Sequence, residues 1–300
     1  MATNRAPQTS IVIRTLNEAA KLGEVLAALT RQTCQDFETL VVDSGSTDRT
    51  LEIAEQFGAR IYCLPQESFT FGYALNYGFA RAQGEYLVAL SGHAIPWCAG
   101  WLARLLSHLE APEVAGSSGG DGFLPGVDYA TIRLRLVALH AGNYLSEPTW
   151  GFSNGVSAVK AELWRRHRFD EKLTGCEDLE WAWFWIKRGY TILWDESCSV
   201  IHEHHETLPQ QCHRIWRECA GTAAFLELPR YGAAAWLTEW LVNPLKESLM
   251  ALRRGYSGAR AAELLGRRRG LLSPAEATYP LEPPEAVPDL ERLPGTEARQ

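Results

Sequence analysis

The stretch ETLVVDSGSTDRT, residues 38–50, predicts a buried strand that ends at Asp43 and is followed by a turn and a helix. Leu40, Val41 and Val42 form a continuous apolar run, which is typical of a parallel strand covered on both faces. Open α/β sheets bind nucleotides at this carboxyl end, where the carboxylate of Asp43 can accept a hydrogen bond from a base ring. Strand-end aspartates more often only cap a turn, so this stretch alone does not decide the function.

The same alternation of strand and helix extends over the first third of the chain. Short apolar runs occur at 10–14, 38–43, 60–64 and 85–91, and the gaps between them carry helical periodicity. This repetition predicts an α/β fold with a doubly wound, mostly parallel, Rossmann-like sheet. The glycine-rich stretch 116–126 predicts a mobile loop beside the site.

The rest of the chain predicts a second structured block and then a change in composition. Strands are expected near 152–159, 190–194 and 198–201, with a helix over 177–189. The pattern then turns helical, and the last part is rich in Pro and Glu, as in segments without a fixed fold. We therefore expect one domain over 1–209 (a nucleotide-binding half about 9–96 and an acceptor or catalytic half about 97–209), a helical region over 210–272 and a tail over 273–300.

Composition limits the partners and the compartment. The net charge of −7 gives no global basic field, which argues against nucleic acid as a partner. The seven cysteines are odd in number and include no C-x-x-C pair, as expected for reduced thiols in a cytoplasmic protein. Because there is neither the apolar core of a signal peptide nor an apolar run of about 18 residues, we expect no export by that route and no membrane span.

Four ordered motifs resemble a known family. They are TSIVIRTLNEA at 9–19, VVDSGSTDRT at 41–50, FGYALNYGFARAQGEYLVALSGHAIP at 71–96 and FDEKLTGCEDLEWA at 169–182. Together they resemble family 2 glycosyltransferases of the GT-A fold, close to the rhamnosyltransferase-like branch. The resemblance implies inverting transfer of a sugar from a UDP- or dTDP-type diphosphate donor to a hydroxyl of a glycan or lipid-linked acceptor. It implies a nucleotide-sugar pocket lined by Thr15, Asn17, Glu18, Asp43, Ser44, Asn76, Ser91 and His93.

The turn after the strand 85–91 departs from the family pattern. Most members carry Asp-x-Asp there, which holds a divalent metal against the diphosphate, whereas this chain has Ser91-Gly92-His93. Mg²⁺ prefers oxygen ligands, and imidazole suits later first-row metals better than Mn²⁺. We therefore expect either a divalent cofactor (Mn²⁺, Mg²⁺ or a later first-row ion) or a metal-independent site in which protonated His93 donates to the leaving phosphate. A histidine that only closes the loop is the alternative.

The acid pair Glu177–Asp178 begins the second constellation. Helical spacing places Asp178 and Trp181 on one face, so a carboxylate and an aromatic ring can point into one cleft. By the resemblance, Asp178 is the catalytic base that takes the proton of the acceptor hydroxyl, with Glu177 beside it. Trp181 and Trp150 are the candidates for acceptor contact. Two acids at a helix start can instead simply complement the helix dipole.

The histidine-rich stretch IHEHH, residues 201–205, forms the third constellation. If the preceding strand continues, His202 and His204 share one face. The resemblance makes His202, and second His204, a ligand of the metal or of the diphosphate, so His93 and His202 should converge on the donor. A surface histidine cluster is one alternative. A structural zinc site is another, built from the cysteines and histidines at 198, 202, 204, 212 and 213.

Several functional alternatives stay open at this stage. The arginine-bearing segment 232–270 predicts either a peripheral contact with the inner face of a membrane or a helix packed on the domain. A GT-A-like sugar or nucleotide-binding protein without turnover is the main rival to an enzyme, although Asp43, Glu177 and Asp178 favour the enzyme. A nucleotidyltransferase is less favoured, because TLNEA at 15–19 is not a glycine-rich phosphate loop.

Overall fold

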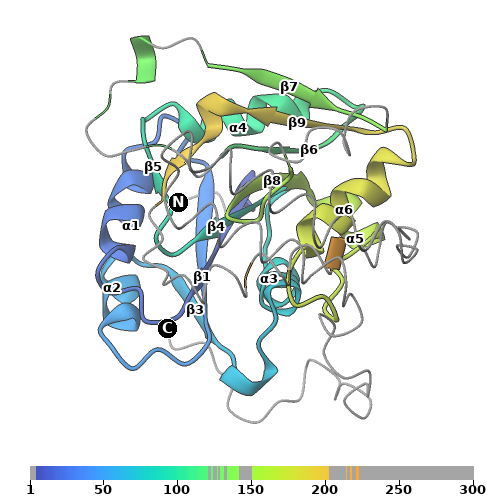
Figure 1. Ribbon diagram of the computed structural model, residues 1–300. Coiled ribbons are helices and arrows are strands. Elements are labelled where there is room, and N and C mark those ends of the chain that lie inside the picture. Colours follow the sequence, from blue (N-terminus) through green and yellow to red (C-terminus); the bar gives the residue numbers. More distant parts are fainter. Residues whose placement is uncertain are drawn as a thin grey trace, which may run out of the picture.

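A mixed eight-stranded sheet forms the centre of the protein (Figure 1). The computed structural model describes residues 5–120, 123, 127, 129–131, 134–141, 151–202, 214, 217, 221 and 222. The strand order is β3-β2-β1-β4-β8-β6-β9-β7, and β5 and β10 form a separate antiparallel pair. The strands are β1 (Thr9–Thr15), β2 (Phe37–Asp43), β3 (Arg60–Cys63), β4 (Tyr86–Ser91), β5 (Ile95–Pro96), β6 (Val114–Ser118), β7 (Leu136–Leu139), β8 (Val156–Lys160), β9 (Thr191–Asp195) and β10 (Val200–Ile201).

Helices cover both faces of the sheet. The α-helices are α1 (Leu22–Thr30), α2 (Thr50–Gln56), α3 (Phe71–Phe79), α4 (Trp101–Ser107), α5 (Ala161–Arg166) and α6 (Glu177–Ile186). Short 3₁₀ turns are η1 (Gln66–Ser68), η2 (His108–Glu110), η3 (Tyr129–Thr131) and η4 (Glu196–Cys198). One apolar core joins the sheet to α1, α2 and α4, and the other joins it to α3, α5 and α6, on the opposite side in Figure 1.

The predicted α/β fold is confirmed, and its parallel half explains the apolar runs. Strands β3, β2, β1 and β4 are parallel, with Thr15 opposite Asp43 and Arg14 opposite Ser91. Ile11 and Ile13 face one core while Val12 faces the other, so both faces of β1 are buried. Burial of one such aliphatic side chain contributes about 1.5–3 kcal/mol.

The glycine-rich stretch that predicted a mobile loop begins as a strand. Gly116, Ser117 and Ser118 belong to β6 and are buried, and β6 pairs with both β8 and β9. Gly116 is needed for packing, because a Cβ there would lie 2.9 Å from the Phe152 ring. A Cβ on Gly119 would lie 2.2 Å from the backbone of Cys198. These glycines permit close packing, so the loop prediction was wrong for 116–118.

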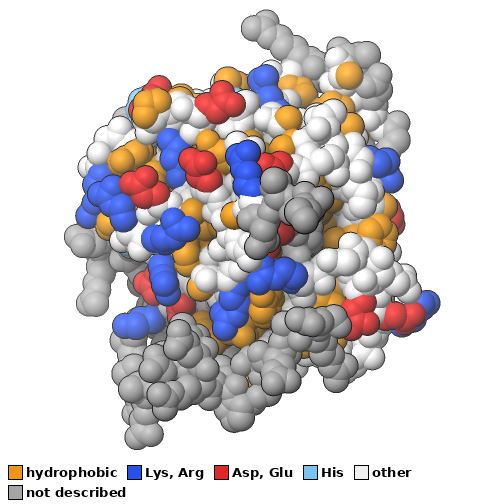
Figure 2. Space-filling model, turned by 180° about the vertical axis from the view of Figure 1, so that it is seen from behind, with side chains coloured by type: hydrophobic (Ala, Val, Ile, Leu, Met, Phe, Trp, Pro, Cys, Tyr) orange, Lys and Arg blue, Asp and Glu red, His pale blue; other side chains and the backbone are white. Residues whose placement is uncertain are grey.

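The surface carries charges of both signs. On the face shown in Figure 2, basic side chains are interspersed with acidic ones. In the described part of the chain, no helix is long and apolar enough to cross a membrane. Most of the expected helical region 210–272, including all of 232–270, and the whole of the tail lie outside the described residues.

Candidate active site

The ends of β1, β2 and β4 bring the predicted nucleotide-side residues together. Thr15 Oγ1 donates to Asp43 Oδ1 at 3.0 Å, and Ser44 Oγ donates to the carbonyl of Thr15 at 3.0 Å. The backbone N–H of Gly92 donates to the carbonyl of Arg14 at 3.0 Å, which places the Ser91-Gly92-His93 turn beside β1. Thr15, the Asp43–Ser44 turn and the Ser91-Gly92-His93 turn therefore lie at one edge of the sheet, where the carboxyl ends of parallel strands meet.

The carboxylate of Asp43 organises the turn that follows β2. Besides the Thr15 hydroxyl, it accepts the backbone N–H groups of Gly45 at 2.9 Å and Ser46 at 2.8 Å, and the Ser46 hydroxyl. A carboxylate offers about four lone-pair directions, so these contacts occupy it. A base ring N–H must therefore share an oxygen with, or replace, one of these partners.

The loop after β1 is fastened to the same turn. Asn17 has left-handed backbone geometry (φ 56°), which asparagine tolerates, and its Oδ1 accepts the backbone N–H of Thr47 at 2.8 Å. Its own N–H donates to Ser46 Oγ at 2.7 Å, and the N–H of Glu18 donates to Thr50 Oγ1 at 2.8 Å. These bonds hold the Glu18 side chain over the sheet edge.

Two histidines that the sequence predicts to converge on the donor lie together at this edge. Pairing of β5 with β10 sets Ile201 opposite Ile95, and the rings of His93 and His202 stack with centroids 4.4 Å apart and planes 23° apart. Nδ1 of His93 lies 2.7 Å from Glu18 Oε1. This contact with the Glu18 carboxylate fixes the orientation of the His93 ring. His204 lies outside the described residues.

The stacked rings do not fit a metal ion held by both. The lone pair of an imidazole nitrogen lies in the ring plane, and a bound ion sits about 2.0–2.1 Å from it in that plane. The two rings are stacked 4.4 Å apart in nearly parallel planes, so lone pairs from the two rings cannot point to the same ion. The arrangement instead suits two hydrogen-bond donors that face one anion.

The acid pair lies at the start of α6, on the side of the sheet that α3 also covers. Glu177 is buried, with 3% of its surface exposed, while the neighbouring Asp178 is only partly buried. Asn154 contacts both: its N–H donates to Asp178 Oδ2 at 2.9 Å and its Nδ2 donates to Glu177 Oε1 at 3.2 Å. Asp178 is therefore the acid that a substrate can reach.

Burial raises the pKa of both acids. Desolvation raises the pKa of Glu177 to about 7, helped by the charge of Asp178 and opposed by that of Arg14. Desolvation also raises the pKa of Asp178 above its usual range, against hydrogen bonds from backbone N–H groups and the charge of Arg14. Titratable groups perturbed in this way are typical of catalytic sites.

Arg14 is a site residue that sequence reasoning missed. Its Nη2 donates to the carbonyl of Asn154 at 3.1 Å, and its guanidinium lies 4.9 Å from the centre of the Phe71 ring. The sequence does contain an indication of this role. Side chains alternate along β1, so Arg14 lies on the same buried face as Val12. A charge at such a position needs a partner, and the two acids provide it.

Two predicted contacts have other roles in the structure. The amide of Asn76 is used by the core: it donates to the Phe169 carbonyl and to Glu171, and accepts from Trp164 Nε1 and the Phe169 N–H. Trp181 is fully buried, packs on Phe152, and donates to the His167 carbonyl at 2.7 Å. Neither side chain presents a free face to a sugar.

Trp150, the other acceptor candidate, lies outside the described residues, as do Cys212 and His213 of the expected zinc alternative. Without them, that alternative keeps only Cys198 and His202 in the described part of the chain.

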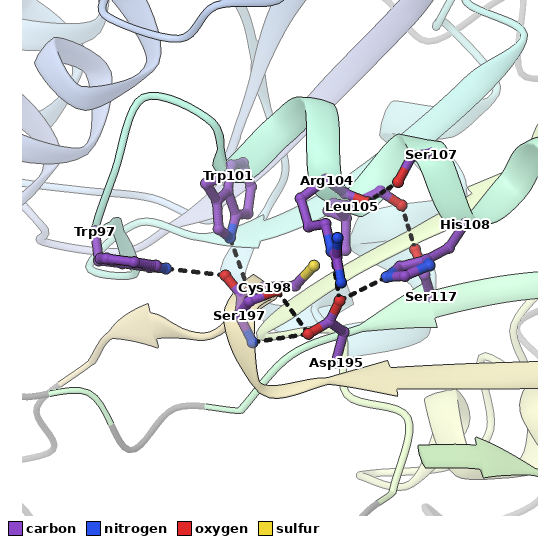
Figure 3. Close-up of polar contacts among 10 residues, drawn as sticks. All are labelled: Trp97, Trp101, Arg104, Leu105, Ser107, His108, Ser117, Asp195, Ser197 and Cys198. Atoms are coloured by element: carbon purple, nitrogen blue, oxygen red, sulfur yellow. Dashed lines mark hydrogen bonds and ion pairs between the residues drawn. The ribbon is translucent and has the colours of Figure 1, made fainter. Parts of the chain in front are cut away.

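A second polar cluster fixes the segment that carries His202 (Figure 3). The carboxylate of Asp195 accepts from Arg104 Nε at 2.8 Å, from the Ser197 backbone N–H at 2.9 Å and from the Ser197 hydroxyl, and lies 2.7 Å from His108 Nε2. These bonds hold the pKa of Asp195 well below its usual range despite burial. The Trp101 indole donates to the Cys198 carbonyl at 2.8 Å.

Ligand atoms of His108, Asp195 and Cys198 lie within 4.8 Å of one another, as in a metal site. Burial raises the pKa of the Cys198 thiol, which opposes the thiolate that a metal needs. The Arg104 cation already occupies the carboxylate, so the cluster is suited to anchoring η4 and β10.

Comparison with known proteins identifies the class to which this site belongs. Residues 10–135 match the sequence model described as Glycosyl transferase family 2. A PGL/p-HBAD biosynthesis glycosyltransferase of Mycobacterium tuberculosis is 38% identical over 120 residues, 39% of this chain and 47% of the relative. The chain thus spans about half the length of such relatives. The O-antigen chain rhamnosyltransferase WbaN of Salmonella anatum is 27% identical over 229 residues, 70% of each chain. The predicted family is confirmed.

Solved structures confirm the GT-A fold. A mannosyltransferase of Pyrobaculum calidifontis, solved with GDP-Man and Mn²⁺, superposes with a TM-score of 0.63 at 19% identity, over 91% of this chain and 87% of that one. TarS 1-349 of S. aureus, solved with UDP, superposes with a TM-score of 0.56 at 16% identity, over 91% of this chain and 92% of that one.

Proposed function

We propose that this protein is an inverting glycosyltransferase that moves a sugar from a nucleotide diphosphate to an acceptor hydroxyl, with Asp178 as the general base. The acid pair carries the proposal. Glu177 is buried and Asp178 is partly exposed, so Asp178 can serve as a base toward a substrate, and a protein that only binds sugars or nucleotides does not need a base. Named relatives that act as glycosyltransferases and neighbours solved with GDP-Man and UDP support it.

The proposed step balances without a covalent intermediate. The acceptor oxygen forms a bond to the anomeric carbon while the bond from that carbon to the diphosphate oxygen breaks. The acceptor proton passes to Asp178, and the electron pair leaves with the nucleoside diphosphate. His93 and His202 donate to the negative charge that builds on the diphosphate, the point where electrostatic stabilisation is most effective.

The nucleotide pocket is proposed at the turn that Asp43 organises. Thr15, Asn17, Glu18 and Ser44 lie at this turn, and Ser91 lies at the same sheet edge at the end of β4. The contacts of Asn76 are with the core. A thermal-shift screen of UDP-, dTDP- and GDP-sugars tests the proposal, because a bound ligand raises the apparent stability. No stabilisation by any of them would contradict a nucleotide-sugar site.

Asp43→Ala should weaken binding of the best nucleotide by about 1.5–3 kcal/mol, the scale of a hydrogen bond to a charged group. Isothermal titration with UDP or dTDP measures this loss. Asp36→Ala, at an exposed position before β2, is the control and should bind like the parent. Equal affinity of Asp43→Ala and the parent would contradict a nucleotide role for Asp43.

His93→Ala should weaken UDP or dTDP binding by about 1.5 kcal/mol or more, because it removes a donor to the diphosphate. Since the stacked rings do not fit one shared ion, nucleotide binding should be the same in EDTA and in Mn²⁺. Titration calorimetry in both buffers measures this. Binding that requires Mn²⁺ would contradict a metal-independent site for the diphosphate.

The acceptor and the location remain parts of the proposal. A glycan or lipid-linked acceptor agrees with the biosynthetic names of the relatives. We propose a cytoplasmic enzyme that meets the inner membrane face through 232–270, with the helical region and tail following the catalytic domain. The rival binding protein without turnover predicts nucleotide binding with no release of nucleoside diphosphate.

A further inference from the structure

Arg14 places a buried positive charge beneath the acid pair. It is the last residue but one of β1, on the face that packs against α3 and α6. Its Nε and Nη1 are buried and have no hydrogen-bond partner among the residues that the structure describes. The guanidinium lies against the Phe71 ring, which supplies a cation–π contact in place of water.

Asn154 links this cation to both acids. Its carbonyl accepts from Arg14 Nη2 at 3.1 Å, its N–H donates to Asp178 Oδ2 at 2.9 Å, and its Nδ2 donates to Glu177 Oε1 at 3.2 Å. One residue therefore fixes all three charged side chains at the same place. Cys176, directly before the pair, has left-handed geometry (φ 67°), a conformation that costs a non-glycine residue about 1–3 kcal/mol.

The other charged groups around the pair are already engaged. On α6, Glu180 lies 3.0 Å from His167 Nε2. On the loop before α6, Glu171 accepts from Asn76 at 2.8 Å, and Cys176 carries a buried thiol. Arg217, which also lies near the Phe71 ring, donates to the Thr174 carbonyl at 3.0 Å. Among the cations described, Arg14 is the one whose charge acts on both acids.

The positive charge of Arg14 can neutralise only one of the two adjacent carboxylates. With both acids ionised, the group carries a net negative charge in a place that water scarcely reaches, which is unfavourable. One positive charge offsets one carboxylate. A base must be ionised before it can accept a proton, so the cation favours the catalytically competent form.

We propose that Arg14 is a positioning residue that keeps Asp178 ionised, acting through its charge and through the shared contact with Asn154. The inference rests on the proposed function, in which Asp178 is the base, and names a further residue on which that base depends. Arg14 itself does not touch the acceptor in this scheme.

Direct titration of the carboxyl groups tests the idea without any substrate. In protein labelled with ¹³C at Asp and Glu carboxyls, the resonances of the pair are assigned with Asp178→Asn and Glu177→Gln. Arg14→Gln keeps an N–H donor for Asn154 but removes the charge, and should raise the pKa of one or both acids by about 1–2 units. Arg14→Lys, which keeps the charge, should largely restore the parent titration.

Arg81→Met is the matched control, because Arg81 also lies on an aromatic ring, 3.5 Å from the centre of Tyr77. Its charge is not among those that shift the pKa of the two acids. This variant should leave both titrations unchanged. If Arg14→Gln does not fold, Arg14→Met serves as a second variant without charge, and Arg14→Lys still reports the effect of keeping it.

Unchanged titration of both acids in a folded variant without the Arg14 charge would overturn the inference, whatever its effect on stability. The proposed function fails separately. If Asp178→Asn turns over like the parent, Asp178 is not the base, even where the titrations shift as expected.

Discussion

Asp178→Asn should lower turnover on the order of 10²–10⁴-fold while nucleotide binding stays near that of the parent. Asparagine is nearly isosteric and can still accept the Asn154 N–H through Oδ1, but it cannot accept a proton from an acceptor hydroxyl. Proton transfer to Asp178 occurs only in the transition state, so its loss should lower kcat rather than the affinity for the donor. The measurement is release of nucleoside diphosphate from the donor that gives the largest thermal shift.

Asp170→Asn is the matched control for this result. Asp170 lies in the same FDEKLTGCED segment, and its carboxylate accepts the backbone N–H of Lys172 at 2.9 Å. Its variant should keep turnover within a few-fold of the parent, because the side chain only closes a turn. Full activity of Asp178→Asn would remove the general base from the mechanism.

The sequence predicted well where local rules and sheet topology act together. The predicted runs 10–14, 38–43 and 85–91 are buried parallel strands, so their carboxyl ends had to meet at one edge. His93 and His202 were expected together because each follows a strand that reaches this edge. Pairing of β5 with β10 brings their rings into contact.

Predictions about single side chains failed where tertiary packing decides whether the side chain faces the site or the core. Helical spacing places Trp181 on the face of Asp178, but it does not say whether that face turns to a cleft or to the core. Asn76 was expected at the nucleotide, yet its amide is used by Trp164, Phe169 and Glu171, far away in sequence. The glycine content at 116–118 suggested mobility. The close packing of this strand on Phe152 could not be foreseen, because it leaves no pattern in the local sequence.

The buried acid pair has a consequence for stability that does not depend on turnover. The pKa of Glu177 rises from 4.5 to about 7 in the folded protein, mainly because burial disfavours the charged form. Between these two values, the folded protein keeps the proton while the unfolded chain has released it. Stability therefore falls as the pH rises through this window, and below it the penalty is absent.

Glu177→Gln should abolish most of this loss. Glutamine keeps an oxygen that can accept from Asn154 Nδ2, and it carries no charge at any pH. At 1.36 kcal/mol for each pKa unit, the full penalty is on the order of 3 kcal/mol, an upper figure because the titration of Glu177 depends on that of Asp178. The unfolding free energy of the variant, relative to the parent, should thus increase by up to about 3 kcal/mol between pH 4 and pH 8.

Urea denaturation across this pH range measures the difference, and Leu179→Ala provides the control. Leu179 lies on the same helix and does not titrate, so its variant should lose stability by the same amount at every pH. Asp178 is present in the parent and in both variants and contributes in the same direction to each. A constant difference between Glu177→Gln and the parent would mean that Glu177 is ionised at neutral pH. In that case Arg14 would have to offset two carboxylates, and Asp178 would have to act as a base beside a second negative charge.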